Sequence, residues 1–370
     1  MPESSLAAVF TGTEKPLETQ RYPLPTLNAG EALIRVTCCT ICGSDLHTYE
    51  GRRTTPLPTI LGHEILGEVV GLPEVPTCDV AGQTLTIGDR VTWSIAASCG
   101  KCFFCTHDLP AKCDSLFKYG HEAINHEHPL SGGLAQYCHL AAGTAIVRIP
   151  ASLPDAVACP ANCATATVVA ALRIGGGCAN ETVLIQGAGM LGLSATALVA
   201  TRGAKHIIVS DINPERLEQA THFGATQTVS VADGDENLTR IIHDTTEGRG
   251  ADLAIELSGA ATSIQAGLRL LRIGGRYVLV GSVFPAPDVP VSAEWIVRRW
   301  LTIRGVHNYA PEDLSSAVQF LEEAHTRYPL EKLVSKNFSL HEAEQAMQYA
   351  IREKPHRVAV LSGDNSLDAS

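Results

Sequence analysis

The chain has 370 residues, of which 45% are hydrophobic and 18% are charged, and this composition excludes disordered, collagen-like and coiled-coil proteins. Its 39 acidic and 28 basic residues give a formal net charge of −11, so nucleic acid and anionic membrane surfaces are excluded as partners. The first ten residues lack a basic segment followed by an apolar core, and we therefore expect a cytoplasmic protein without a signal peptide.

The N-terminal part of the chain predicts a β-rich domain. Short alternating segments at residues 32–38, 65–72 and 145–149 are typical of strands, and dense Pro and Gly residues separate them. We expect this domain to cover residues 1–162.

From about residue 163 onward, strand-like and helix-like segments alternate. Strands are expected at residues 182–186, 206–211, 226–231, 251–257, 276–281 and 302–306, with helical segments between them. This alternation predicts an α/β domain with a doubly wound parallel sheet over residues 163–305. Residues 306–370 hold two helical stretches and a last strand at 357–361. They are too few to fold alone, so we expect them to complete the N-terminal domain.

Four closely spaced cysteines indicate a structural zinc site. The spacing C-x2-C-x2-C-x7-C lets one loop surround a tetrahedral ion, and four thiolates leave no position open for a substrate. An Fe–S cluster or four unrelated buried cysteines are the alternatives. The predicted ligands are Cys99, Cys102, Cys105 and Cys113.

A second group of residues predicts a zinc site with one open position. Cys42 begins the segment CGSDLH, and His63 lies in the segment GHE. One more thiolate would complete a three-ligand catalytic site, and Cys163 is the candidate, with Cys159 as its nearest rival. The alternative is that both cysteines are small buried residues and His63 is a core histidine.

A glycine-rich turn predicts dinucleotide binding. Gly187, Gly189 and Gly192 form G-x-G-x-x-G directly after an expected strand and at the start of a helix, where pyrophosphate binds. Asp211 ends the next strand, where a carboxylate accepts both ribose hydroxyls of NAD and repels the 2′-phosphate of NADP. A glycine turn in an ordinary α/β protein is the alternative. The remaining expected cofactor contacts are Met190, Leu191 and Arg216.

The chain resembles the zinc-dependent medium-chain alcohol dehydrogenases. The resemblance rests on the four-cysteine site, the Cys/His site with an open position, and the dinucleotide-binding motif in the second part of the chain. The resemblance extends over nearly the whole chain. It implies a GroES-like fold for the β-rich catalytic domain, a Rossmann fold for the second domain, and a homodimer or homotetramer. The chain is also similar to a subgroup of this family associated with phosphonate catabolism.

The resemblance implies roles for individual residues. Cys42, His63 and Cys163 match the ligands of the catalytic zinc, because in the family the third ligand precedes a T-V-x-x-A-L segment. Several neighbouring positions also match. They are Glu64, an acid that can exchange onto the zinc, Asp45, which orients the histidine ligand, and the proton-relay residues Ser44 and His47.

We therefore expect an NAD-dependent zinc alcohol dehydrogenase. It would interconvert a primary or secondary alcohol and its aldehyde or ketone by hydride transfer from a zinc-bound alkoxide. Reduction of an aldehyde is the alternative direction, and a non-catalytic, zinc-stabilised nucleotide-binding relative is the alternative class of protein.

Two further features leave the substrate open. Arg52 and Arg53 follow the catalytic cysteine and would suit a phosphonate-bearing or other anionic alcohol, although exposed loop arginines are the simpler interpretation. The histidines of the loop at residues 115–133 are either substrate contacts or, as we expect, members of a solvated loop. They are His121, His126 and His128.

Overall fold

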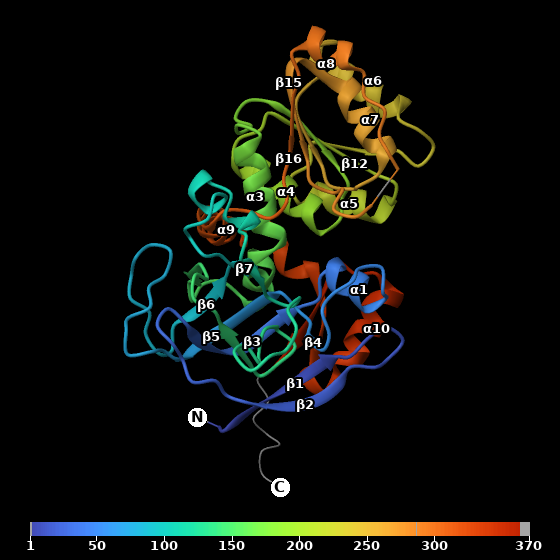
Figure 1. Cartoon of the computed structure of the whole chain (residues 1–370). Coiled ribbons are helices and arrows are strands. Elements are labelled where there is room, and N and C mark those ends of the chain that lie inside the picture. The colour runs from blue at the N-terminus through green and yellow to red at the C-terminus, as the bar shows by residue number, and fades with distance from the viewer. Residues whose placement is uncertain (1, 286, 363–370) are drawn as a thin grey trace. The chain divides into compact units, whose positions relative to one another are not determined.

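The computed structural model describes residues 2–285 and 287–362, which form two compact units (Figure 1). The first unit contains the chain up to Cys163, Ala310–Glu322 and the residues from Glu331 onward. The second unit contains Ala164–Tyr309 and Glu323–Leu330. Each unit has its own sheet.

The first unit is built on a largely antiparallel seven-stranded sheet in the order β10-β6-β5-β3-β18-β17, with β9 also paired to β3. Its strands are β3 (Ala32–Thr40), β5 (Glu64–Gly71), β6 (Arg90–Trp93), β9 (Tyr137–Leu140), β10 (Ile146–Arg148), β17 (Val334–Ser339) and β18 (Arg357–Leu361). The C-terminal strand β18 thus pairs with β3, far from it in sequence. Smaller sheets are formed by β1 (Ser4–Phe10), β2 (Glu18–Pro23) and β4 (Thr59–Ile60), and by β7 (Ala96–Ala97) and β8 (Phe117–Lys118).

Strand register brings three chain segments to one edge of this sheet. Thr40, the last residue of β3, lies opposite Glu64, the first residue of β5, and also opposite Ala359 of β18. The segment after β3, the segment before β5 and the start of β18 therefore lie close together. The helices of this unit are α1 (Gly43–Tyr49), α2 (Asp155–Ala158), most of α9 (Pro311–Ala324) and α10 (Ala343–Glu353).

Helices α1 and α10 lie side by side (Figure 1), and the hydroxyl of Tyr49 in α1 donates a hydrogen bond to Glu344 of α10 at 2.6 Å. Beneath these elements the apolar faces of β3, β5 and β6 form a core with fully buried side chains such as Trp93 and Tyr119. The end of β3 therefore adjoins a well-packed apolar core.

The second unit contains a six-stranded parallel sheet in the order β13-β12-β11-β14-β15-β16. The order reverses between β11 and β14, which is the arrangement of a Rossmann fold. Its strands are β11 (Thr182–Gln186), β12 (His206–Asp211), β13 (Gln227–Ser230), β14 (Ala251–Glu256), β15 (Leu271–Leu279) and β16 (Thr302–Gly305). The predicted fold class is confirmed.

Helices cover both faces of this sheet (Figure 1). Helix α5 begins at Pro214 because the side chain of Asn213 accepts the backbone N–H groups of Glu215 and Arg216. Figure 1 shows α3 and α4 on one side of the sheet and α6 and α7 on the other. The helices are α3 (Ala164–Ile174), α4 (Met190–Thr201), α5 (Pro214–His222), α6 (Glu236–Thr246), α7 (Ala261–Leu270) and α8 (Ala293–Arg299).

Within the described residues, no single helix is both long enough and apolar enough to cross a membrane, although a pair of helices broken near Cys163 meets the length and composition criteria. Residues 182–201, which carry no charged side chain, form strand β11, a glycine turn and helix α4.

Candidate metal centres and dinucleotide site

The shared sheet edge of the first unit gathers the expected catalytic metal ligands. Cys42 directly follows β3 and His63 directly precedes β5, while Cys163 follows the 3₁₀ helix Cys159–Asn162. Their ligand atoms and a carboxylate oxygen of Glu64 all lie within 4.8 Å of one another. The side chain of Asn162 donates to the carbonyl of His63 at 2.9 Å and so holds the turn carrying Cys163 beside β5.

Cys159, the other candidate for the third ligand, is not a member of this group of ligand atoms. It is fully buried, and its thiol donates to the backbone carbonyls of Cys38 and Glu64 at 3.3 Å each. Burial raises the pKa of this thiol well above its usual value. The geometry therefore favours Cys163 as the third ligand.

Asp45 orients two of the ligands from the first turn of α1. One carboxylate oxygen accepts the Nδ1–H of His63 at 3.1 Å, and the other accepts the backbone N–H of Cys42 at 2.9 Å. Burial alone would lower the pKa of His63, but Asp45 and the Cys42 thiol raise it to about 10. With Nδ1 occupied in this way, Nε2 is the nitrogen that can bind a metal.

Arg357 is a residue of this site that the sequence did not reveal. Its guanidinium donates to both carboxylate oxygens of Glu64 at 2.7 Å and lies 3.4 Å from the sulfur of Cys42. Thr40 donates to the same carboxylate at 2.6 Å. Hydrogen bonding with Cys163 and the charge of Arg357 lower the pKa of Cys42 well below its usual value, which favours the thiolate that a metal requires.

Helix α1 also carries the expected relay residues. The hydroxyl of Ser44 lies 3.4 Å from Nε2 of His63. His47 follows three residues later, a spacing that puts two side chains on the same side of a helix. Burial, followed by the charge of Arg52, lowers the pKa of His47. His47 is therefore neutral near neutral pH and can accept a proton.

Two thiol sulfurs and one imidazole nitrogen are a donor set that suits Zn²⁺. The lowered pKa of Cys42 and the occupied Nδ1 of His63 prepare these side chains to coordinate a cation. Because Arg357 and Thr40 hold the Glu64 carboxylate, that residue is engaged elsewhere in this structure. These residues fit a zinc site with three protein ligands.

The four-cysteine cluster forms a second potential metal site. The sulfurs of its members lie within 4.8 Å of one another, and Cys113 accepts the backbone N–H groups of Cys99 and Ser115 at 3.2 and 3.4 Å. Backbone N–H donors lower the pKa of Cys102 to about 6. Four converging sulfurs stabilised by backbone donors fit a structural zinc ion. The members are Cys99, Cys102, Cys105 and Cys113.

The histidines of the loop at residues 115–133 differ from one another. His126 is exposed, as expected for a solvated loop, and His128 is half-buried with its ring 4.9 Å from that of His139. His121, in contrast, is only 6% exposed, and its ring lies 5.2 Å from the ring of the metal-ligand candidate His63. For His121 the expectation of a solvated position was wrong, because the loop folds back over the sheet edge.

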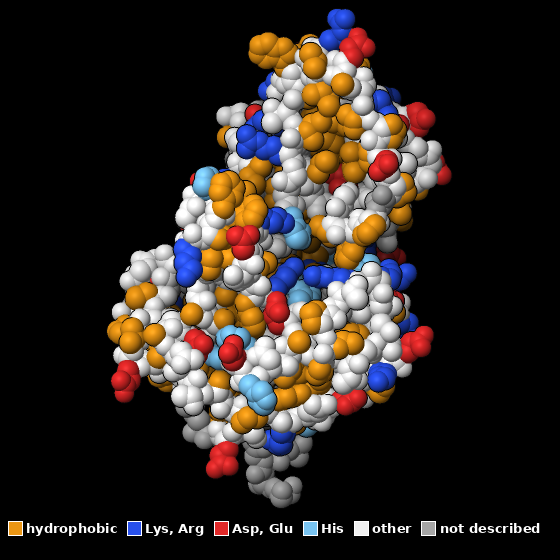
Figure 2. Space-filling model, viewed as in Figure 1, with side chains coloured by type: hydrophobic (Ala, Val, Ile, Leu, Met, Phe, Trp, Pro, Cys, Tyr) orange, Lys and Arg blue, Asp and Glu red, His pale blue; other side chains and the backbone are white. Residues whose placement is uncertain are grey.

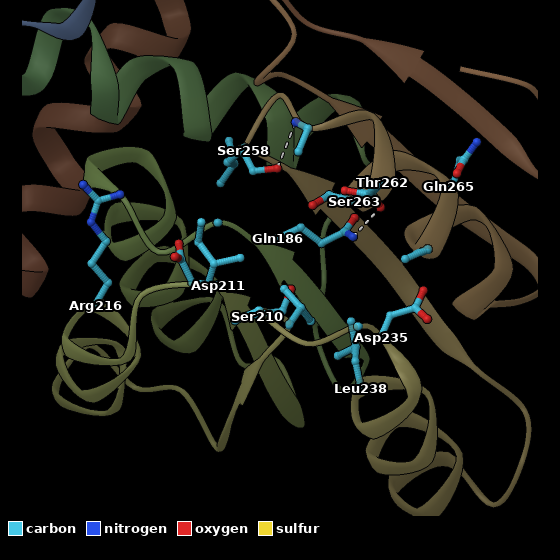
Figure 3. Close-up of a pocket in the computed structure, with 18 of the residues that line it drawn as sticks. Gln186, Ser210, Asp211, Arg216, Asp235, Leu238, Ser258, Thr262, Ser263 and Gln265 are labelled. Carbon is cyan, nitrogen blue, oxygen red and sulfur yellow. Dashed lines mark hydrogen bonds between the residues drawn. The ribbon is translucent and has the colours of Figure 1, made fainter. Parts of the chain in front are cut away.

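The second unit has a cavity of about 770 Å³ at the glycine turn. Figure 3 shows Ser210 and Asp211, at the end of β12, facing the same cavity as Gln186 and Ser258. One oxygen of Asp211 accepts the backbone N–H of Ala188 at 2.6 Å, so this carboxylate also holds the glycine turn in place.

The three glycines of the turn are needed for different structural reasons. Gly187 has a φ of +100°, and a Cβ on Gly192 would lie 1.9 Å from the carbonyl oxygen of Gly187. A Cβ on Gly189 would meet only the guanidinium of Arg216, at 3.9 Å. The first and third glycines are therefore required by the turn, and the second leaves the backbone open to a ligand.

Arg216 rises from α5 beside Asp211 and lines the same cavity (Figure 3). The sequence predicted Arg216 as a cofactor contact. Its guanidinium would lie 3.9 Å from a Cβ on Gly189 and is therefore close to the glycine turn.

Comparison with known proteins agrees with this architecture. Residues 28–151 match the family model of the alcohol dehydrogenase GroES-like domain, and residues 191–323 match that of the zinc-binding dehydrogenases. The chain is 34% identical over 338 residues to 5-exo-hydroxycamphor dehydrogenase of Pseudomonas putida, covering 90% of this chain and 92% of that protein. The chain belongs to the zinc-dependent medium-chain alcohol dehydrogenase family.

The names of other relatives of this zinc-dependent dehydrogenase indicate substrates different from that of the camphor enzyme. L-threonine 3-dehydrogenase of Alteromonas mediterranea is 30% identical over 339 residues, covering 90% of this chain and 92% of that protein. The crystal structure of an alcohol dehydrogenase from Thermotoga maritima superimposes with a TM-score of 0.91 at 29% identity, covering 97% of this chain and 99% of that one. The protein is thus a zinc-binding oxidoreductase, and its substrate must be argued from its own residues.

Proposed function

We propose that this protein oxidises a primary or secondary alcohol to the aldehyde or ketone, or catalyses the reverse reduction, with NAD(H) as hydride carrier. The observation that carries the proposal is the convergence of Cys42, His63 and Cys163, with Asp45 fixing two of them. A structural zinc site has four protein ligands, often four cysteines. This group offers three ligands, and the carboxylate of Glu64 is already paired with Arg357, so one coordination position is left for a substrate.

When bound, zinc supplies a Lewis acid that makes a substrate hydroxyl more acidic. The chain's own residues then hold and move the proton. Ser44, beside His63, would accept the hydroxyl proton and release its own, and His47, whose pKa is lowered by burial, would be the final acceptor of the released proton. Asp45 keeps His63 in one orientation, and Arg357 stabilises the negative charges of the Glu64 carboxylate and the Cys42 thiolate.

We propose NAD rather than NADP as the cofactor. The carboxylate of Asp211 ends β12 at the cavity, where it would accept the two ribose hydroxyls and repel a 2′-phosphate. Arg216 lies in the same cavity, so some tolerance of NADP is expected. The cradle for the pyrophosphate is the turn at Gly187, Gly189 and Gly192, followed by Met190 and Leu191 at the start of α4.

The direct test is turnover of an alcohol panel by the zinc-loaded protein, monitored by NADH absorbance. Ser44→Ala should lower kcat about 100-fold, the usual contribution of a positioned proton acceptor, while Ser115→Ala on an exposed loop position should not. NAD binding without turnover of any alcohol or aldehyde would instead support the non-catalytic class of protein.

We also propose that the protein assembles into a homodimer or homotetramer, as its family implies. Strand β16 is the last strand in the order of the parallel sheet, and beside it Val297 and Trp300 are 71% and 82% exposed. Figure 2 shows hydrophobic side chains gathered on the part of this unit that carries α7 and α8. The molar mass in solution tests this assignment, and Trp300→Glu should lower it.

A further inference from the structure

Arg53 is positioned beside the catalytic metal ligands without an acidic partner. Its backbone N–H donates to the carbonyl of His47 at 3.0 Å, which holds it close to α1, and its Nη1 lies 3.3 Å from Nε2 of His121. Its neighbour Arg52 is 58% exposed and forms an ion pair with Glu50. In the part of the chain that the structure describes, no carboxylate forms an ion pair with Arg53.

Lys118 is a second cation at this place. It ends β8, and burial together with the charge of Arg53 lowers the pKa of its ammonium group to about 8. The backbone N–H of His121 donates to the carbonyl of Lys118 at 3.1 Å, and the ring of His121 lies 5.2 Å from that of His63, so Lys118 is held close to the metal ligands. The nearby Glu122 accepts the backbone N–H of Lys118 at 3.0 Å, and no described carboxylate pairs with its ammonium group.

His121 adds a hydrogen-bond donor. Because a guanidinium only donates, the contact with Arg53 makes Nε2 of His121 the acceptor, which requires a neutral ring. Its proton therefore resides on Nδ1, which is buried and has no hydrogen-bond partner among residues 2–285 and 287–362. A buried donor without an acceptor is unfavourable unless a ligand supplies one.

The remaining charges of the site nearly cancel. A bound divalent zinc ion would offset the thiolates of Cys42 and Cys163, and Arg357 offsets Glu64. The single carboxylate of Asp45 is already bound by three hydrogen bonds, to His63, Cys42 and Gly62.

The positive charges of Arg53 and Lys118 are offset by no carboxylate among the described residues, so they add a net positive charge beside the metal ligands. Figure 2 shows Lys and Arg side chains gathered with histidine on the first unit near α1. A ligand at this place could bind in two ways. Its hydroxyl would bind the metal, and a negatively charged group would bind the two cations and the unused N–H donor.

We propose that Arg53, Lys118 and His121 bind an oxyanion on the alcohol substrate, so that the preferred substrate is a short alcohol carrying a carboxylate or a phosphoryl group. The inference rests on the proposed dehydrogenase function and names its substrate class. The guanidinium and the ammonium would pair with the oxyanion, and Nδ1–H of His121 would donate one further hydrogen bond. A neutral alcohol would leave all three groups unsatisfied.

The test compares 4-hydroxybutanoate, 2-hydroxyethyl phosphate and butan-1-ol as substrates of the zinc-loaded enzyme. The wild-type kcat/KM should be at least about tenfold higher for one of the anionic alcohols than for butan-1-ol, the usual effect of one charge-assisted hydrogen bond. Which anion is preferred distinguishes a carboxylate from a phosphoryl substrate. Arg53→Gln and, separately, Lys118→Gln should reduce that anionic-to-neutral ratio at least about tenfold.

Arg52→Gln is the matched control, since Arg52 is the adjacent arginine with an acid already paired to it, and it should leave the ratio unchanged. A ratio that stays the same in Arg53→Gln and Lys118→Gln, or a wild-type enzyme that prefers butan-1-ol to both anions, would overturn the proposal. Calorimetric binding of 4-hydroxybutanoate gives a second measurement. If no alcohol is oxidised but Arg53→Gln still weakens this binding, the dehydrogenase proposal fails and the anion site stands.

Discussion

The guanidinium of Arg357 donates to both carboxylate oxygens of Glu64 at 2.7 Å, although 293 positions separate the two residues. Both side chains are almost completely buried. The pair joins the C-terminal strand β18 to β5 at the sheet edge that carries the metal ligands. It links the stability of the first unit to the electrostatics of the catalytic site.

Removal of one member of this pair should be costly. Arg357→Gln would leave the Glu64 carboxylate buried without its cation, and we expect a loss of about 3–5 kcal/mol in the free energy of unfolding. Urea unfolding measures this, with Arg352→Gln, an exposed arginine paired with Glu353, as control. The double variant Arg357→Gln, Glu64→Gln should lose less than the sum of the single losses. Additive losses would show that the two residues do not depend on each other.

Asp45 should determine the affinity for zinc rather than take part in the catalytic step. Asp45→Asn removes the charge that orients His63, and we expect zinc binding to weaken by about 10–100-fold. Competition with a chromogenic chelator measures the zinc affinity, and Asp108→Asn at an exposed loop position is the control. Unchanged affinity in Asp45→Asn would exclude a role for Asp45 in orienting the ligand.

Asp211 should determine which cofactor is used. Asp211→Gly removes both the acceptor for the ribose hydroxyls and the charge that repels a 2′-phosphate, so the ratio of NADP to NAD efficiency should rise at least about tenfold. Arg216 lies in the same cavity and should support the gained NADP use, which Arg216→Gln would reduce again. The kinetic constants with both cofactors measure this, and Asp233→Gly at an exposed position should leave the preference as it is.

The anion site should depend on pH through Lys118. Burial first, then Arg53 and Lys112, lower the pKa of this ammonium group to about 8, while Cys163 and Cys42 oppose the shift. Lys118 is charged below this pH, so the KM of an anionic alcohol should rise as the pH increases from about 7 to about 9. The KM of butan-1-ol should not follow the same change, and the difference should disappear in Lys118→Gln. A constant ratio of the two KM values over this range would contradict the assignment.

The sequence predicted best those features whose residues are adjacent in the chain. The glycine turn and the four-cysteine loop each lie within a short segment, so the spacing of their residues indicates their geometry. The alternation of strands and helices similarly predicted the parallel sheet. Family resemblance was needed to choose Cys163 over Cys159, because nothing local distinguishes two cysteines separated by three residues.

The rest depends on contacts between distant segments. Arg357 reaches Glu64 only because β18 pairs with β3, and this pairing cannot be deduced from the arginine's neighbours. His121 is buried because its loop folds over the sheet edge, whereas its polar sequence context is typical of a solvated loop. Arg52 and Arg53 are adjacent and chemically identical, yet one pairs with Glu50 and the other contacts His121.

The number of zinc ions per chain, determined by elemental analysis, tests the central claim most directly. We predict two equivalents in the fully loaded protein, with Cys42→Ser and Cys102→Ser each losing one. Cys42→Ser should abolish turnover with little loss of stability, whereas Cys102→Ser should lower the unfolding temperature because a structural zinc contributes folding energy. A single equivalent that survives Cys42→Ser and disappears in Cys102→Ser would contradict the account, since the three-ligand site would then hold no metal.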